Sequence, residues 1–231
     1  MRLALALSIL CTLAALGCAG CGRMDGIPPR TEEVVRPEDI LDFWTLYHQN
    51  CSACHGENGQ DGPAMDLANP VYQSLVDDSS LKKWITGGMP GTEMPAFGES
   101  AGGFLTERQV DALVAGMRQN WAKSGENLSG IPVYAAVSSG DAKAGEQVYA
   151  SACESCHNKP GAQITNPTYL ALVSDQALRT ITIAGRPDLR HPDWQHARQG
   201  QPLTDADVTN VVAYLASLRT PTPGQPYPGR P

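Results

Sequence analysis

The chain has 231 residues, of which 42% are hydrophobic, so it is long enough for one large or two small globular domains. Its net charge is −7, and Arg2 is the only charged residue among the first twenty, so the remainder carries −8. An acidic chain without a basic stripe is not expected to bind nucleic acid.

Residues 1–21 have the pattern of an export leader. Arg2 precedes an apolar run, Leu3 to Leu16, that is too short to span a bilayer comfortably. The small residues that follow resemble a bacterial lipoprotein signal, in which a cysteine is acylated after cleavage. Cys18 and Cys21 are the candidate lipid anchors, and a plain secretory leader is the alternative. Both interpretations export the protein to the periplasmic side of a bacterial membrane, and in the first the acyl chains would tether it there.

A helical unit is expected to follow a tether formed by residues 22–36. Its first helix is predicted to begin at about Pro37, because proline suits the first turn of a helix. Ile40, Trp44 and Tyr47 then fall on one apolar face.

Two more helices are predicted in this unit. A short one starts at Ser79 or Ser80 and ends at the glycine pair that begins with Gly87, which is a stop signal. The last begins at Thr106, and Gln109, three residues later, completes a capping box.

The unit is then repeated. The segment NPVYQSLVDDSSL, from Asn69, matches NPTYLALVSDQAL, from Asn166, without a gap. The same offset of 97 residues continues through GMPGTEMPAF and GRPDLRHPDW, where His191 stands opposite Met94. Because a repeat fixes the architecture, we expect an all-α chain of two tandem modules.

The second copy carries its own helix signals. Asp141 can cap its first helix, and its last helix is predicted from Thr204. The tail after the last helix is too rich in Pro and Gly to be helical. The expected organisation is a leader (1–21), a tether (22–36), a first module (37–123), a linker (124–137), a second module (138–219) and a tail (220–231).

Each copy contains a Cys-x-x-Cys-His motif. The residues are Cys51, Cys54 and His55 in the first copy, and Cys153, Cys156 and His157 in the second. This spacing is typical of covalent haem attachment, because two thiols three residues apart can add to the two vinyl groups of one haem while the histidine binds its iron. Modules of about eighty residues have small hydrophobic cores, which a covalently bound haem would stabilise. The sequence therefore predicts two haem c groups.

Paired cysteines have two other common uses, and both fit less well. A thioredoxin-type redox pair is expected near a βαβ pattern, which this sequence lacks, and it has no need of the histidine. A zinc site shared by the two pairs is disfavoured because they lie 102 residues apart, one in each copy.

With these motifs, residues 38–219 resemble class I c-type cytochromes, specifically tandem di-haem forms. The resemblance implies modules whose first and last helices cross around one haem. It also implies a sixth iron ligand from a loop ahead of the last helix, typically the methionine of Met-Pro. The segment MPAF, which begins at Met94, matches that loop. The implied ligand pairs are His55 with Met94 and, through the repeat, His157 with His191.

The sequence offers alternative iron ligands at both sites. Met89 also precedes a proline, but its counterpart in the repeat is an arginine. Met65 lies in a loop that faces the wrong way in the family. At the second site, His196 is the alternative to His191. A second alternative is that this haem has no sixth ligand from the protein. The family also implies that a backbone carbonyl near a proline, here Pro63 or Pro160, accepts a hydrogen bond from the axial histidine.

No acid/base pair, phosphate loop or further metal motif stands out in the sequence. The expected function is therefore that of an electron carrier rather than an enzyme. It would pass electrons between a membrane respiratory or photosynthetic complex, or a soluble redox partner, and an acceptor. The alternative is a di-haem peroxidase-like enzyme or a haem sensor with an open sixth position on the second haem.

Overall fold

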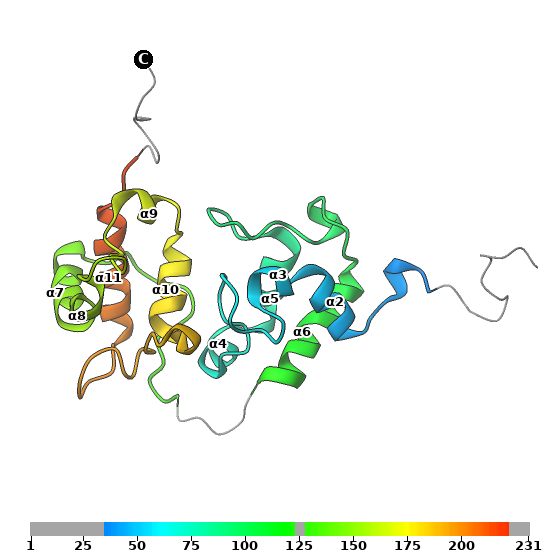
Figure 1. The fold of residues 1–231 in the computed structure, drawn as a ribbon, viewed down its shortest axis with the longest axis horizontal. Coiled ribbons are helices and arrows are strands. Elements are labelled where there is room, and N and C mark those ends of the chain that lie inside the picture. Colours follow the sequence, from blue (N-terminus) through cyan, green and yellow to red (C-terminus); the bar gives the residue numbers. More distant parts are fainter. Residues whose placement is uncertain (1–34, 123–127, 222–231) are drawn as a thin grey trace, which may run out of the picture. The chain divides into compact units, whose positions relative to one another are not determined.

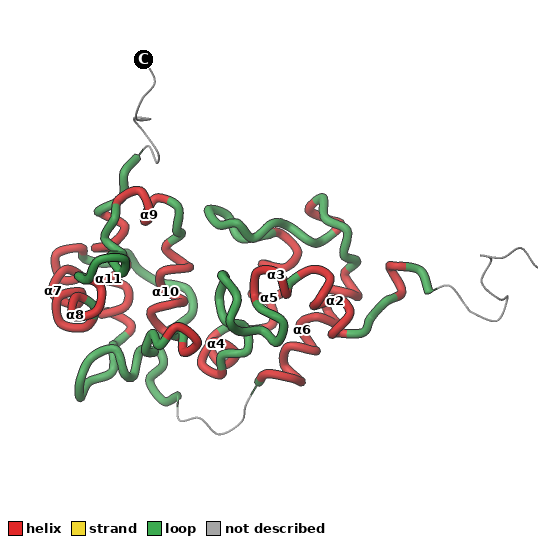
Figure 2. Tube along the Cα trace, in the orientation of Figure 1, coloured by secondary structure: helices red, strands yellow, loops and turns green. Residues whose placement is uncertain are grey.

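The computed structural model describes residues 35–122 and 128–221, which form helices joined by loops (Figures 1 and 2). The predicted leader, nearly all of the tether and most of the tail lie outside the described residues. Extended pairing within the described residues is limited to two isolated bridges. The all-α fold class is thereby confirmed. In the described part of the chain, every helix is too short or too polar to cross a membrane.

The first module runs from a 3₁₀ turn to a long final helix. Its elements are the turn Pro37–Asp39, α2 (Phe43–Asn50), α3 (Ser52–His55), α4 (Pro70–Leu75), α5 (Asp78–Gly87), a 3₁₀ turn at Glu99–Ala101 and α6 (Glu107–Trp121).

The second module repeats this order. Its elements are α7 (Ala142–Ala152), α8 (Glu154–His157), α9 (Pro167–Ala171), α10 (Asp175–Ala184), a 3₁₀ turn at Pro187–Leu189 and α11 (Asp205–Ser217).

The first and last helices of the first module cross in close contact. The ring of Trp121 on α6 lies 5.4 Å from that of Phe43 and 5.1 Å from that of Tyr47, both on α2. At Gly116 the helices approach so closely that an added Cβ would lie 2.2 Å from the Phe43 ring. The crossing therefore needs a residue without a side chain at this position.

The second module crosses α7 and α11 in the same way. An added Cβ at Gly145 would lie 1.9 Å from the carbonyl oxygen of Asn210, and the rings of Tyr149 and Tyr214 lie 5.5 Å apart. Both modules thus have the crossed helices that the family resemblance implies.

Several predicted helix starts are confirmed. Thr106 and Gln109 form the capping box of α6, and Asp141 caps α7. Thr204 caps α11, where Asp207 completes a second capping box.

The predicted start of the first helix was wrong. The chain makes only a 3₁₀ turn after Pro37, and α2 begins at Phe43, capped by Asp42. The carbonyl of Ile40 instead accepts a hydrogen bond from Gln109 of α6, a tertiary contact that sequence periodicity cannot register.

The start of α5 is also corrected. The helix is capped by Asp77, whose carboxylate accepts from the Ser80 amide, so it begins at Asp78 instead of after Ser79 or Ser80. Its end at Gly87 agrees with the prediction, and Gly88 follows with a φ of 71°.

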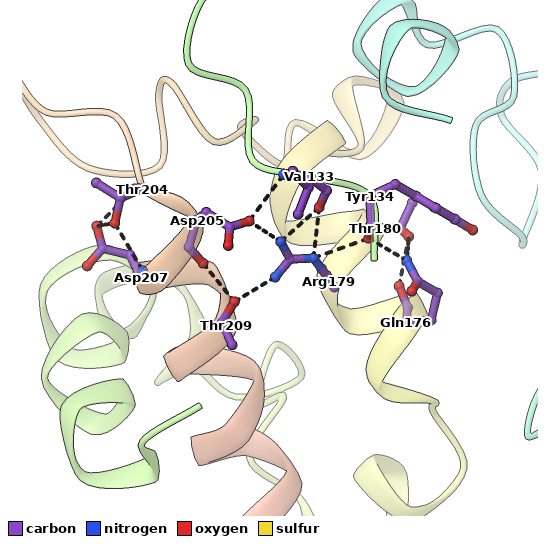
Figure 3. Close-up of polar contacts among 9 residues, drawn as sticks. All are labelled: Val133, Tyr134, Gln176, Arg179, Thr180, Thr204, Asp205, Asp207 and Thr209. Atoms are coloured by element: carbon purple, nitrogen blue, oxygen red, sulfur yellow. Dashed lines mark hydrogen bonds and ion pairs between the residues drawn. The ribbon is translucent and has the colours of Figure 1, made fainter. Parts of the chain in front are cut away.

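The described part of the linker is anchored to the second module by Arg179 of α10 (Figure 3). This side chain is 2% exposed, and it donates hydrogen bonds to the carbonyls of Val133 and Tyr134. It also donates to Thr209 over 2.9 Å and forms an ion pair with Asp205, both on α11. One guanidinium therefore holds the linker against two helices.

The modules pack against each other through α4 of the first and α10 of the second. The Asn69 side chain, which caps α4, donates a 2.8 Å hydrogen bond to the Ala184 carbonyl at the end of α10. Asn69 is 3% exposed, whereas its repeat counterpart Asn166 is exposed. The same helix motif is therefore covered in the first module and open in the second.

Candidate haem sites

The first Cys-x-x-Cys-His motif spans the junction of α2 and α3. Cys51 follows the end of α2, while Cys54 and His55 lie on the single turn of α3. The Nδ1 atom of His55 donates to the Met65 carbonyl over 2.7 Å. A carbonyl only accepts, so Nδ1 carries the proton and Nε2 is left as a free ligand nitrogen. Burial lowers the pKa of His55, which favours the neutral form that binds a metal.

The second motif is built in the same way. Cys153 follows α7, and His157 ends the single turn of α8. Its Nδ1 donates to the Ala162 carbonyl over 2.7 Å.

The acceptor carbonyls hold a common position in the two modules. Each belongs to the residue two positions after the proline singled out in the sequence, Met65 after Pro63 and Ala162 after Pro160. The repeat therefore preserves the spacing from the proline, although the spacing from the histidine differs.

The four cysteines of the two motifs differ in exposure. Cys51 and Cys153 are partly buried, while Cys54 and Cys156 are exposed. Burial, reinforced by the neighbouring thiol, raises the pKa of Cys51 to about 12 and that of Cys153 to about 11. Thioredoxin-type cysteines have lowered pKa values, so these are poor redox pairs.

A zinc site shared by the two cysteine pairs is also unsupported. Within residues 35–122 and 128–221, no group of three or more His, Cys, Asp or Glu side chains is placed to hold a metal ion.

The loops that carry Met94 and His191 start alike and are closed by the same backbone hydrogen bond to the carbonyls of these two residues, although only the second loop contains a 3₁₀ turn. Each follows a glycine in the left-handed region, Gly88 with φ 71° and Gly185 with φ 69°. An added Cβ would lie 2.9 Å from the Met94 carbonyl oxygen in the first case and 2.8 Å from that of His191 in the second. The two candidate ligands therefore occupy equivalent positions relative to the glycine that starts each loop, in agreement with the gapless alignment.

At the second site the two histidine rings face each other. The ring centroids of His157 and His191 lie 5.9 Å apart, with 46° between the ring planes. One metal ion bound at about 2 Å from each of two imidazole nitrogens requires ring centroids roughly 6 Å apart. These two side chains therefore fit a single iron held between them.

The rival ligand His196 is engaged elsewhere. Its side chain is 71% exposed, and its Nδ1 lies 2.7 Å from the carboxylate of Asp193. This arrangement favours His191 over His196 at the second site.

At the first site, Met94 is partly buried against the core. Its carbonyl accepts from the amide of Met89, and its own amide donates to the Thr92 hydroxyl. Met117, by contrast, is 2% exposed within the core. Met65 contributes its carbonyl to the His55 ring.

Sequence reasoning missed two arginines that brace the modules. Arg118 at the end of α6 donates to the carbonyls of Gln73 and Val76, which close α4. Arg219, after α11, donates to the carbonyls of Leu170 and Val173 around α9. Each is also paired with an aspartate at the same repeat position, Asp78 for Arg118 and Asp175 for Arg219, but the arginines themselves do not align in the repeat.

Comparison with known proteins shows the family of the chain. The family described as "Cytochrome C oxidase, cbb3-type, subunit III" matches twice, over residues 38–115 and 140–215. The chain belongs to this family. It is an electron-transfer cytochrome with two c-type haem modules, so the predicted family, cofactors and general function are confirmed.

Two individual proteins also resemble the chain. It is 30% identical over 142 residues to "Cbb3-type cytochrome c oxidase subunit CcoP" of Azospirillum sp. (strain B510), a match that covers 54% of this chain and 43% of that protein. A chain of the Kuenenia stuttgartiensis reducing HAO-like protein complex Kustc0457/Kustc0458 matches with a TM-score of 0.43 and 18% identity. That match covers 80% of this chain and 97% of the other.

Proposed function

We propose that the chain is a membrane-tethered electron carrier on the periplasmic side, held by a lipid on Cys18 or Cys21. It would pass electrons between a membrane redox complex and an acceptor. The facing pair of His157 and His191 supports this function most strongly, because it closes the second haem site on both sides. A closed site suits electron transfer, whereas a peroxidase or sensor needs an open sixth position.

The residues of each module have distinct roles in this proposal. Cys51 and Cys54, and likewise Cys153 and Cys156, would hold the two haem groups through thioether bonds. A bound haem supplies one-electron chemistry at its iron. The Met65 and Ala162 carbonyls orient the proximal histidines by accepting their ring protons.

The unlike sixth ligands would separate the two sites in potential. A thioether from Met94 favours ferrous iron and raises the reduction potential, whereas the His191 imidazole favours ferric iron. The first site would therefore have the higher potential, which favours electron flow from the second module to the first.

A terminal oxidase is the partner complex we favour. The match to a protein named as a cbb3-type oxidase subunit supports this choice, although the chain spans less than half the length of that relative. The acidic chain, with a net charge of −7, would favour partners with a basic docking surface.

The test is the ferric absorption spectrum of the purified protein with and without cyanide. Two low-spin haems that bind cyanide slowly or not at all would support the carrier. A high-spin haem that binds cyanide rapidly would contradict it and favour the peroxidase or sensor. Fractionation of cells that express C18S and C21S variants would then identify the anchor, since loss of the acylated cysteine should release the protein from the membrane.

A further inference from the structure

A buried ion pair lies where the two modules meet. Arg186 and Asp188 have side chains only 8% and 4% exposed, and the guanidinium binds both carboxylate oxygens, over 2.9 Å and 2.6 Å. Arg186 replaces the Met89 of the first copy at the same repeat position, so this charge is particular to the second module.

The ion pair belongs to the ligand loop of the second haem site. The backbone amides of Arg186 and His191 each donate to the other's carbonyl, over 3.1 Å and 2.9 Å. A shift of the arginine would therefore move the backbone of the candidate iron ligand.

The same guanidinium reaches the first haem site. Its Nη2 donates a 2.8 Å hydrogen bond to the Gly62 carbonyl in the first module. Gly62 packs so tightly on the haem-attachment turn that an added Cβ would lie 2.3 Å from the Cys54 carbonyl oxygen. Three residues after Gly62 comes Met65, whose carbonyl holds the His55 ring. Arg186 thus connects the proximal loop of one site to the distal loop of the other.

We propose that the Arg186–Asp188 pair couples the two haem sites, by fixing these loops to each other and by holding its positive end, the Arg186 guanidinium, between them, where it raises the reduction potential of both irons. A positive charge near an iron opposes its oxidation, since oxidation adds a further positive charge. The inference rests on the proposed electron-carrier function.

The experiment is a spectroelectrochemical titration of the haem-loaded full-length protein and its R186M/D188N variant. Removing both partners leaves neither member of the pair buried alone, so the fold should be preserved. We expect both midpoint potentials to fall, by about a factor of ten in each reduction equilibrium constant, or about 59 mV for one electron. R186K keeps the charge and should stay closer to the wild-type values.

R179M/D205N is the matched control, because it also removes an arginine–aspartate pair of the second module. Arg179 forms its hydrogen bonds and its ion pair only with residues 133–209, so it does not connect the two haem sites. Its potentials should match the wild type. The inference is overturned if R186M/D188N leaves either haem at its wild-type potential, or if the control shifts both equally. A wild-type protein without two low-spin haems would instead refute the proposed function, so the two failures are distinguishable.

Discussion

The imidazole rings of His157 and His191 face each other with their centroids 5.9 Å apart, although 33 residues separate them in the sequence. The Nδ1 of His157 donates to the Ala162 carbonyl, and His191 follows a glycine of positive φ, as Met94 does. Met94 and His191 thus hold the same position in the two copies of the repeat, where one side chain offers a sulfur and the other a nitrogen.

Replacement of His191 tests the second ligand pair. H191G should open the sixth position, so that about half of the haem becomes high-spin in the ferric state and binds cyanide rapidly. H196Q is the matched control, because His196 is exposed and paired with Asp193. Its spectrum should equal that of the wild type. If H196Q, and not H191G, produced the high-spin species, the ligand assignment would have to be exchanged.

Replacement of Met94 tests the first ligand pair. M94H exchanges a thioether for an imidazole, which should lower the potential of the upper redox wave and leave the lower wave in place. A redox titration that resolves both waves is the measurement. M89H provides the comparison, since Met89 lies in the same loop at a position predicted not to bind iron. An effect of M89H equal to that of M94H would argue against Met94 as the ligand.

Replacement of Arg179 tests how the linker is held. R179M leaves two linker carbonyls without their buried donor and breaks the ion pair with Asp205, so we expect a loss of about 2 to 4 kcal/mol in the free energy of unfolding. Denaturant unfolding of the haem-loaded protein measures it.

The first module supplies the control for that variant. Lys82 stands at the repeat position of Arg179, and its pair with Asp111 is about half exposed on both sides. K82M should therefore cost far less free energy of unfolding than R179M does. Equal losses in K82M and R179M would show that the linker contacts add no stability.

Replacement of the repeated asparagines tests the contact between modules. N69A and N166A each remove a helix cap, which costs about 1 kcal/mol. N69A also leaves the buried Ala184 carbonyl without its hydrogen-bond donor, which should lower the free energy of unfolding further, by about 1 to 3 kcal/mol. Thermal unfolding of the two variants side by side measures the difference, and equal destabilisation would contradict a stabilising role for the Asn69–Ala184 bond.

Local signals in the sequence predicted much of the architecture. The caps at Thr106, Asp141 and Thr204 depend on neighbouring residues only, and all three formed where expected. The repeat also indicated that the two ligand loops start alike, and Gly88 and Gly185 do have the same positive φ.

Long-range contacts account for what the sequence left out. The first helix starts late, at the Asp42 cap, and the Ile40 carbonyl ahead of it accepts instead from Gln109, 69 residues away. The role of Arg186 depends on a carbonyl 124 residues away in the other module. The exchange of Met89 for Arg186 was visible in the repeat, but only packing shows what the arginine touches.

The most direct test of the central claim is a near-infrared spectrum of the ferric protein, combined with its haem content. We expect two covalently bound haems per chain, one with the sulfur-to-iron band of a Met94 thioether and one low-spin haem without it. One haem per chain, sulfur bands from both haems, or a high-spin second haem would contradict the account.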